Sequence, residues 1–442
     1  MFDISAILQC LAAHLDKKSL RQLDLIAQAL LAMTGRVTML SLSRWTEKGG
    51  SYRSIQRFFN SKVLWCELHW CLLRSHVVSE DDVYLLAGDE VVVSKAGKRS
   101  FGLDRFFSSL YGRPVKGLCF FSLSLVSVKR RSAYPLLAQQ VLRTAEENAA
   151  AKAKREQAKG KAPAQAQRGR PRGSKNRDKV NVALSRQLKF IQGLLREVLN
   201  LLRTLIEVRY VVLDGAYGYN EVMQLARQLD LALISKLKRN AALYFPYAGE
   251  QKSTGAKRKY GDKLDYQKIP SKYLQSSTVE NTIQTDIYRL TLLHKEFAQP
   301  LNVVVIVKTK LSTGERAHVL LFSSDLSLAA DKLIDYYSLR FQIEFTFRDA
   351  KQFWGLEDFM NVAETPIHNA ANLSLFMVTL SKVLITHQGS GQPNWSVLDL
   401  KAHVRAEKYA LETIKLLPQK LDAFLIRQIL TAIPKIGAIR TA

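Results

Sequence analysis

The chain is poor in cysteine, in acidic residues and in long hydrophobic runs. Its 442 residues include four cysteines, too few and too scattered for a disulfide framework. No apolar run approaches the ~18 uninterrupted residues that a membrane helix requires. Asp3 stands where a secretory leader would be neutral or cationic, so we expect no leader. These shortages predict a cytoplasmic protein without a membrane anchor.

Basic residues far outnumber the acidic ones. The chain has 65 Lys and Arg against 39 Asp and Glu, a formal charge of +26 and a pI near 9.9. Such an excess binds polyanions through counterion release, so nucleic acid is the expected partner, ahead of a role in solubility alone. The length and the 47% hydrophobic content allow two or three domains.

Two aspartates interrupt apolar runs of strand length. Asp89 lies in the run 83–93, and Asp214 follows the run 210–213. An unpaired aspartate is costly to bury, so two neighbouring strands that each deliver one predict an oxygen-rich pocket for Mg²⁺ or Mn²⁺. The rivals of Asp89 are Asp81 and Asp82, which precede the strand, and Glu90, which should point to the opposite sheet face.

The segment 337–351 combines reactive side chains at helical spacing. On one continuous helix Tyr337, Arg340, Glu344 and Lys351 would share a narrow stripe, with Phe345 and Phe347 on either side. This pattern predicts a phosphate-handling face on a helix that packs into a core. Its glutamate would complete the metal pocket begun by the two aspartates.

These residues together resemble a known family. The spacing Y-(2)-R-(3)-E-(6)-K from Tyr337 to Lys351, with Asp89 and Asp214 upstream, is similar to that of the DDE transposases of bacterial insertion sequences, specifically the IS-four family. The resemblance covers roughly residues 80–360. It implies that Asp89, Asp214 and Glu344 are catalytic and bind Mg²⁺, for which Mn²⁺ can substitute. It also implies that the tyrosine and the basic residues of this segment hold DNA phosphates near the cut: Tyr337, Arg340, Arg348 and Lys351.

The implied activity is cut-and-paste transposition. A homodimer would act on double-stranded DNA at the terminal inverted repeats, and the freed 3′-hydroxyl ends would join target DNA in the bacterial nucleoid. Two alternatives stay open: a decayed DNA-binding repressor or architectural protein, and a ribonuclease H-like nuclease without strand transfer.

The implied fold class is α/β, with flanking helical parts. Residues 1–80 predict a helical DNA-binding domain, and 81–365 a ribonuclease H-like catalytic domain. Within the latter, 145–181 is a basic flexible linker and 239–326 a β-rich insertion. Residues 366–442 predict a helical region with a dimer contact.

Two basic motifs lie outside the signature. Ser51 is a candidate N-cap of a helix that carries Arg53 and Arg57, which is typical of a helix-turn-helix and equally of a plain bundle helix. The linker holds an AT-hook-like core whose alternative is a generic basic tether, and its arginines are Arg168, Arg170 and Arg172.

Two further patterns concern metal binding and base stacking. A zinc site built from the cysteines and histidines of 66–76 is disfavoured, because their spacing fits no closed tetrahedral motif. No tryptophan lies between Trp70 and Trp354, so a base flipped during hairpin formation would need Tyr244, Phe245 or Tyr247 as its stacking partner.

Overall fold

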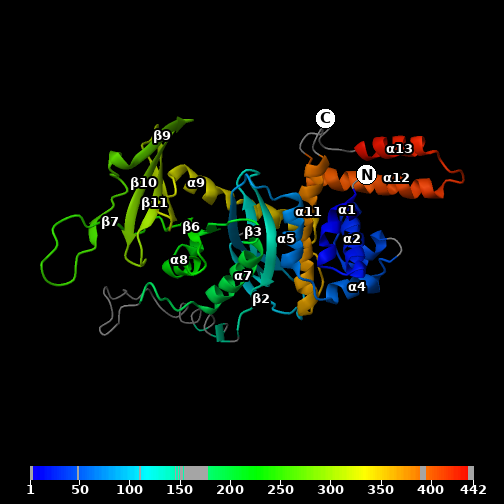
Figure 1. The fold of residues 1–442 in the computed structure, drawn as a ribbon, viewed down its shortest axis with the longest axis horizontal. Coiled ribbons are helices and arrows are strands. Elements are labelled where there is room, and N and C mark those ends of the chain that lie inside the picture. The colour runs from blue at the N-terminus through cyan, green and yellow to red at the C-terminus, as the bar shows by residue number, and fades with distance from the viewer. Residues whose placement is uncertain are drawn as a thin grey trace.

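The computed structural model describes residues 3–46, 49–108, 111–144, 146–147, 149, 153, 178–388 and 395–436. The molecule is elongated (Figure 1). Helices from both ends of the chain lie at one end of it, a sheet with covering helices occupies the middle, and long strands form the other end. A mixed α/β fold is thereby confirmed.

The described residues before Tyr84 are helical. Polar side chains begin three of the helices: Asp16, Thr38 and Ser51 each accept a hydrogen bond from the backbone N–H three residues later. The elements are α1 (Ile4–Leu8), η1 (Gln9–Ala13), α2 (Lys17–Ala32), α3 (Met39–Trp45), α4 (Tyr52–Asn60) and α5 (Trp65–His76).

Strand β1 (Tyr84–Ser94) lies in the interior of the sheet. On one side it pairs antiparallel with β3 (Arg113–Ser127), which also pairs with β2 (Asp104–Ser108) and β4 (Ser132–Gln140). On its other side β1 runs parallel to β5 (Tyr210–Leu213). Strand β5 in turn runs parallel to β6 (Ala232–Lys236). The apolar runs 83–93 and 210–213 predicted β1 and β5.

Helices cover both faces of this sheet. On one face, α7 (Arg186–Leu202) and α8 (Asn220–Arg227) share a core with alternate β1 residues such as Leu86. On the other face, α9 (Ala330–Leu339) packs against Leu85 and Ala87. Because side chains alternate along a strand, Asp89 belongs to the α9 face and Glu90 to the α7 face.

The β-rich segment after β6 extends the same sheet. Its last strand, β12 (Arg316–Ser323), pairs antiparallel with β6, and the described residues form one 12-stranded sheet. The other strands are β7 (Leu243–Pro246), β8 (Tyr260–Lys263), β9 (Leu274–Glu280), β10 (Ile283–His294) and β11 (Leu301–Lys310), with the turn η3 (Ser271–Tyr273) before β9. The sequence predicted a β-rich insertion over 239–326, and these strands lie within that range.

The prediction that residues 337–351 form one continuous helix is wrong. The chain forms α9 up to Leu339 and α10 (Gln342–Phe353) after it, and the N–H groups of Arg340 and Phe341 bond to carbonyls only three residues back. This tighter winding breaks the regular i to i−4 ladder, so the angles expected from one straight helix do not hold. Tyr337 therefore lies on α9 and Lys351 on α10.

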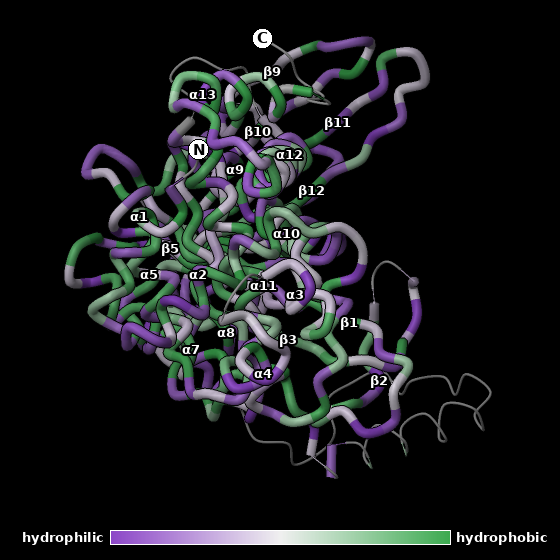
Figure 2. Tube along the Cα trace, turned by 90° about the vertical axis from the view of Figure 1, so that its right-hand side faces the viewer, coloured by the Kyte–Doolittle hydropathy of each residue, from purple (hydrophilic) through white to green (hydrophobic). Residues whose placement is uncertain are grey.

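The C-terminal part continues as α11 (Glu364–Gln388), α12 (Val397–Leu416), α13 (Ala423–Ala432) and η4 (Ile433–Lys435). Helix α11 is long and apolar enough to cross a membrane, but 78% of its most apolar stretch is buried inside the protein, as in a core helix. It shares a hydrophobic core with α2, α4 and α10, and Figure 2 shows α2, α3 and α11 close together.

The N-terminal helices are tied closely to the end of α10. Gly355 has a φ of +78°, and a Cβ built on it would lie 2.3 Å from the Cβ of Val37. Only glycine permits this backbone conformation and this approach without displacement. The helices before β1 and the signature helix therefore belong to one packed unit.

Candidate active site

Asp89 and Asp214 meet at one edge of the sheet. Gly88 pairs in register with Leu213, so the next residue of each parallel strand is an aspartate. Asp214 directly follows β5 and caps the turn η2 (Gly215–Tyr217) by accepting a hydrogen bond from the Ala216 N–H at 2.6 Å. The Ser235 hydroxyl donates to the Asp214 carbonyl at 2.7 Å. Asp214 thus lies at the carboxyl end of β5, where α/β sheets commonly bind ligands, and Asp89 lies beside it in the middle of β1.

Glu344 reaches the same edge from the first turn of α10, and Arg340 connects it to Asp89. The Arg340 Nη1 lies 3.1 Å from Asp89 Oδ2, and its Nη2 lies 3.4 Å from Glu344 Oε1. The arginine side chain is only 12% exposed. We call Asp89, Asp214 and Glu344 the acidic triad, because the fold brings together three residues from distant parts of the sequence.

The Asp89 carboxyl has the clearest sign of this crowding. Burial raises its pKa to about 6, although the Glu90 N–H and the Arg340 guanidinium act to lower it. The charges of Asp214 and Glu344 raise the pKa further. A carboxyl with such a shift, in contact with a charged partner, is typical of a functional site.

Tyr337 lies beside the acidic triad on α9. The Arg340 guanidinium lies 5.8 Å from the centre of its ring. Burial raises the pKa of the Tyr337 phenol, and the nearby Arg340 lowers it while Asp214 and Asp89 raise it. The tyrosine and the arginine of the signature therefore border the acidic triad.

The remaining signature cations point elsewhere. The Lys351 Nζ donates to the Val92 carbonyl at 2.9 Å and pairs with Glu357 at 2.8 Å. Arg348 pairs with Asp349 at 3.1 Å on the surface. In this structure Lys351 lies on the same face of α10 as Glu344, seven residues further on, and fastens the chain after α10 to β1.

The rival acids are engaged outside the triad. Glu90 accepts hydrogen bonds from Tyr217 at 3.1 Å and Gln187 at 3.0 Å on the opposite sheet face. Asp82 accepts from the Lys129 N–H at 2.9 Å, and Asp81 pairs with the Lys129 ammonium. Their positions leave Asp89 as the strand acid that meets Asp214 and Glu344.

The acidic triad has the chemistry of a divalent-cation site, but its oxygens are not gathered around one point. Among the described residues, no three or more His, Cys, Asp and Glu side chains stand close enough together to share a metal ion. The Arg340 guanidinium forms ion pairs with two of the triad carboxylates, those of Asp89 and Glu344. Carboxylate oxygens are nevertheless the donors that Mg²⁺ and Mn²⁺ prefer, so the residue types fit such an ion.

The other predicted residues are distributed along the chain. Arg53 and Arg57 are exposed on α4, while Ile55, Phe58 and Phe59 face the core. The cysteines and the first histidine of 66–76 are buried in α5, and burial lowers the pKa of His69 to about 3. Tyr244 and Phe245 are partly buried on β7, and Tyr247 is partly exposed just after it. The AT-hook-like residues Arg168, Arg170 and Arg172 lie outside the described residues.

Sequence reasoning missed Lys236. It ends β6, one strand beyond Asp214, and Val212 pairs in register with Ile234, which places Lys236 beside Asp214. The available signal was a lysine at the end of the third apolar parallel strand.

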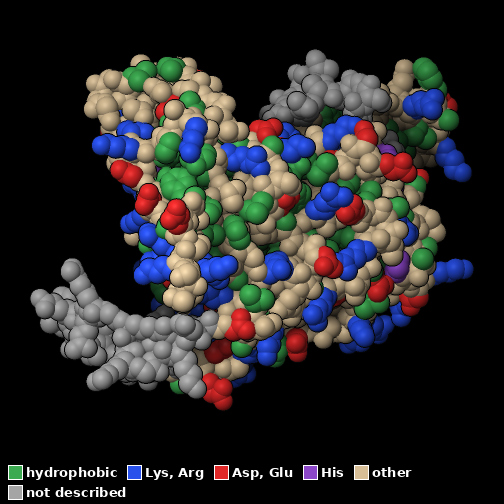
Figure 3. Space-filling model, turned by 60° about the vertical axis from the view of Figure 1, so that its left-hand side comes forward, with side chains coloured by type: hydrophobic (Ala, Val, Ile, Leu, Met, Phe, Trp, Pro, Cys, Tyr) green, Lys and Arg blue, Asp and Glu red, His purple; other side chains and the backbone are tan. Residues whose placement is uncertain are grey.

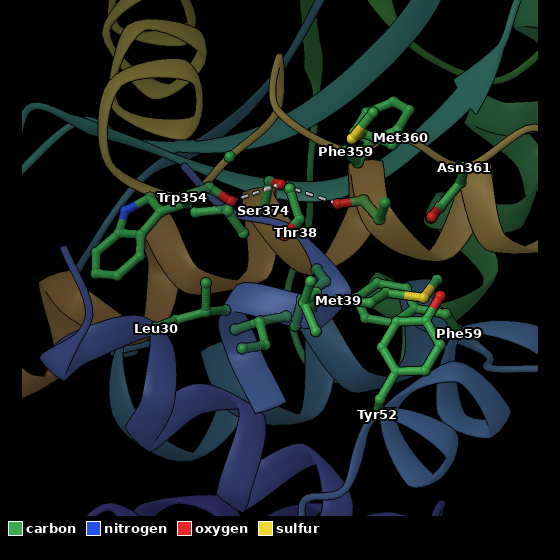
Figure 4. A pocket seen from close by; sticks show the side chains of 16 residues that line it. Leu30, Thr38, Met39, Tyr52, Phe59, Trp354, Phe359, Met360, Asn361 and Ser374 are labelled. Atoms are coloured by element: carbon green, nitrogen blue, oxygen red, sulfur yellow. Dashed lines mark hydrogen bonds between the residues drawn. The ribbon is translucent and has the colours of Figure 1, made fainter. Parts of the chain in front are cut away.

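An apolar cavity of about 250 Å³ lies apart from the acidic triad (Figure 4). The N-terminal helices, the chain after α10 and α11 form its walls, with Tyr52, Phe59 and Met360 around it. Ser374 in its wall already bonds to the carbonyls of Trp354 and Ala370 at 2.9 Å each. None of the triad residues lines this cavity, so it is not where the candidate chemistry would occur.

Comparison with known proteins identifies the class. Residues 10–299 match the family described as DDE superfamily endonuclease. The chain therefore belongs to the DDE superfamily of endonucleases, whose members generally use divalent metal ions.

The remaining comparisons add little. One similar solved structure is described as a piggyBac transposase synaptic complex with hairpin DNA; the likeness has a TM-score of 0.38 and 9% identity, and covers 100% of this chain and 78% of that one. No curated protein matches the chain.

Proposed function

We propose that this endonuclease is a DNA transposase of the IS-four family. It would cleave the ends of its insertion sequence at terminal inverted repeats and join the freed 3′-hydroxyl ends to target DNA. The observation that carries this proposal is the meeting of Asp89, Asp214 and Glu344 at one sheet edge, with Arg340 in contact with two of them. The Y-(2)-R-(3)-E-(6)-K spacing supports the family.

We also propose that the core is ribonuclease H-like. Support comes from the strand order β4, β3, β1, β5, β6, in which three antiparallel strands are followed by two parallel ones. Helices α7 and α8 connect the later strands, as α/β folds require. We propose 1–80 as the DNA-binding part, 81–365 as the catalytic part and 366–442 as the dimerisation part.

The acidic triad would hold Mg²⁺, or Mn²⁺ in its place. When bound, such an ion polarises a phosphoryl oxygen and makes a coordinated water more acidic. Arg340 presents a planar fork that can grip two phosphate oxygens, and the Tyr337 hydroxyl can donate to a third. These side chains would orient the backbone of the DNA at the cut, first for attack by water and later for attack by the 3′-hydroxyl.

The alternatives differ in what they predict. A decayed DNA-binding protein would have lost pressure to keep the acids together, whereas the fold places all three at one edge. A ribonuclease H-like nuclease would cleave but would not join ends. A strand-transfer assay on a target plasmid separates this nuclease from a transposase.

Glu344→Gln tests the proposal. The substitution removes a carboxylate charge but keeps the basic surface, so cleavage of a duplex bearing the inverted repeats that flank the gene should be lost in Mg²⁺. Binding measured by gel shift should stay nearly unchanged. Glu90→Gln is the matched control, because its amide can keep the bonds to Tyr217 and Gln187, and it should cleave normally. Cleavage that survives Glu344→Gln would refute the three-acid mechanism.

A further inference from the structure

Lys236 lies next to the two aspartates where the pairing of the parallel strands ends. Gly88 of β1 pairs with Leu213 of β5, and Val212 of β5 pairs with Ile234 of β6. Continued by one and two residues, these registers put Asp214, directly after β5, between Asp89 of β1 and Lys236 at the end of β6. Directly neighbouring residues of parallel strands point to the same face. Since adjacent strands are ~4.8 Å apart, the Lys236 backbone lies about 10 Å from that of Asp89.

The backbone of Lys236 is held firmly against the loop that carries Asp214. A Cβ on Gly218 would lie 2.3 Å from the Lys236 carbonyl oxygen, so this loop approaches β6 as closely as glycine permits. A Cβ on Gly215 would be 3.5 Å from the Lys236 Cβ and 3.8 Å from its Cγ. The stem of the lysine therefore passes over the residue that follows Asp214.

The ammonium group of Lys236 is available for a ligand. The residue is exposed, and within the described part of the chain its Nζ has no hydrogen bond or ion pair. The other cations near the triad are engaged: Arg340 with two carboxylates, Lys351 with Glu357 and the Val92 carbonyl. Lys236 thus presents an uncommitted positive charge beside the acids.

An acidic active site needs such a charge when its substrate is a polyanion. Asp89 and Glu344 share the single guanidinium of Arg340, so the triad as a whole repels the phosphates of DNA. A nearby cation offsets this repulsion and fixes the strand in register, and a flexible ammonium suits one phosphate as a point charge.

We propose that Lys236 binds a backbone phosphate of the DNA next to the one that is cut. This assignment rests on the proposed function, because it takes DNA as the substrate of the acidic triad. It makes Lys236 a substrate-binding residue that neither the signature nor the strand acids include.

The test compares Lys236→Ala and Lys236→Arg with Lys308→Ala. Lys308 is also exposed, and its ammonium makes no hydrogen bond or ion pair with the described residues, but it lies on β11, farther along the sheet. Binding of a fluorescent duplex ending in the flanking inverted repeat is measured by anisotropy between about 50 and 200 mM salt. Lys236→Ala should weaken binding about three- to tenfold and make the slope of log K against log salt shallower by about 0.9, one phosphate equivalent.

Lys236→Arg should restore both values, and Lys308→Ala should leave the slope unchanged. Replacing single phosphates around the cut with neutral methylphosphonates locates the contact. At the phosphate that Lys236 binds, the replacement should weaken binding by the wild type but should not weaken binding by Lys236→Ala any further. The assignment would be overturned if Lys236→Ala kept the wild-type slope of log K against log salt, or if Lys236→Ala and Lys308→Ala lost the same affinity.

The readout is binding, so its failure differs from failure of the proposed function. Cleavage by Glu344→Gln would refute the three-acid mechanism and leave the Lys236 binding result readable. If no inverted repeats flank the gene, the same titration with a mixed-sequence duplex still decides whether Lys236 contacts phosphate.

Discussion

Arg340 is the residue on which the geometry of the acidic triad depends. Its guanidinium touches Asp89 and Glu344 and is almost fully buried. Its Nε is buried without a hydrogen-bond partner within the described structure, so its two carboxylate contacts are made by the outer nitrogens. The same side chain cannot keep both contacts and also grip a phosphate, so binding of DNA and release of the carboxylates should go together.

Arg340→Gln should therefore strengthen metal binding in the absence of DNA. The substitution frees two carboxylate ligands and removes a positive charge that repels a cation. We expect Mn²⁺ to bind about tenfold more tightly, or about 1.4 kcal/mol, in a titration followed by water proton relaxation. Arg348→Gln is the control, because its guanidinium pairs with Asp349 on the surface. Equal Mn²⁺ affinity in wild type and Arg340→Gln would show that Arg340 does not compete with the ion.

At this scale the sequence predicted the acids better than the cations. Asp89 and Asp214 could be recognised because each disturbs an otherwise apolar strand, and a buried acid needs a reason. The partners of Lys351, the Val92 carbonyl and Glu357, could not be foreseen, because they depend on how α10 packs against β1. Lys236 escaped notice because a lysine at a strand end looks like ordinary surface until the strand register is known.

Among the elements, α12 closes the C-terminal end of α2. Arg405 donates to the carbonyls of Ala32 at 2.8 Å and Met33 at 3.4 Å, and the Lys401 ammonium donates to the Leu30 carbonyl. Lys401 also lies 4.6 Å from the centre of the Trp354 ring. Cations at a helix C-terminus satisfy carbonyls that lack partners within the helix. The two ends of the chain are joined in this way.

The burial of Lys401 makes this junction sensitive to pH. Burial lowers the pKa of Lys401 from 10.5 to about 7, and the charge of Arg405 lowers it further. Between these pH values the unfolded chain binds a proton that the folded protein does not, so stability rises with pH. In urea unfolding, the free energy of unfolding of the wild type, relative to that of Lys401→Met, should increase by on the order of 2 kcal/mol from pH 7 to pH 9.

Lys62→Met is the control for this measurement, since Lys62 is exposed on the surface. Its difference from wild type should not change with pH. A pH-independent difference for Lys401→Met as well would mean that the lysine stays charged in the folded protein.

Long apolar elements were predictable and polar or short ones were not. Strands β1, β3 and β11 bury continuous rows of side chains and β10 buries alternate ones, and a hydrophobic pattern reveals both arrangements. Strand β9 is exposed along its whole length and is held by backbone pairing to β10, which leaves no pattern in its side chains. The break at Arg340 and Phe341 arises from packing of α9 and α10 against different cores, which a local sequence window does not contain.

At the scale of the whole molecule, the positive charge is spread out. Figure 3 shows Lys and Arg side chains distributed over the face in view, with Asp and Glu between them. Such a surface binds DNA through many weak phosphate contacts, whereas the position of the cut depends on the few residues at the sheet edge.

The C-terminal end offers a surface for a second copy of the chain. Helix α13 lies along α12 (Figure 1), has no buried residue, and exposes Phe424 by 70% and Leu425 by 39%. We expect this apolar surface to bury itself in the proposed dimer.

Phe424→Glu should then shift the protein toward monomers in sedimentation velocity, with and without the end duplex, because a charge in an apolar interface is costly. Val279→Glu, at a residue of β9 that is 60% exposed, should leave the distribution unchanged. Monomers in the wild type under both conditions would contradict the dimer.

The pairing of β6 with β12 has a consequence for how the polypeptide could be divided. The segment between β7 and β8 is exposed around Gly249 and Gly255, and the sheet holds the chain together on both sides of it through β6 with β12 and β7 with β10. A protease that nicks this segment would leave two pieces joined by backbone hydrogen bonds and a shared core. The protein could therefore be made as two separate polypeptides that reassemble, with Asp89 and Asp214 supplied by one piece and Glu344 by the other.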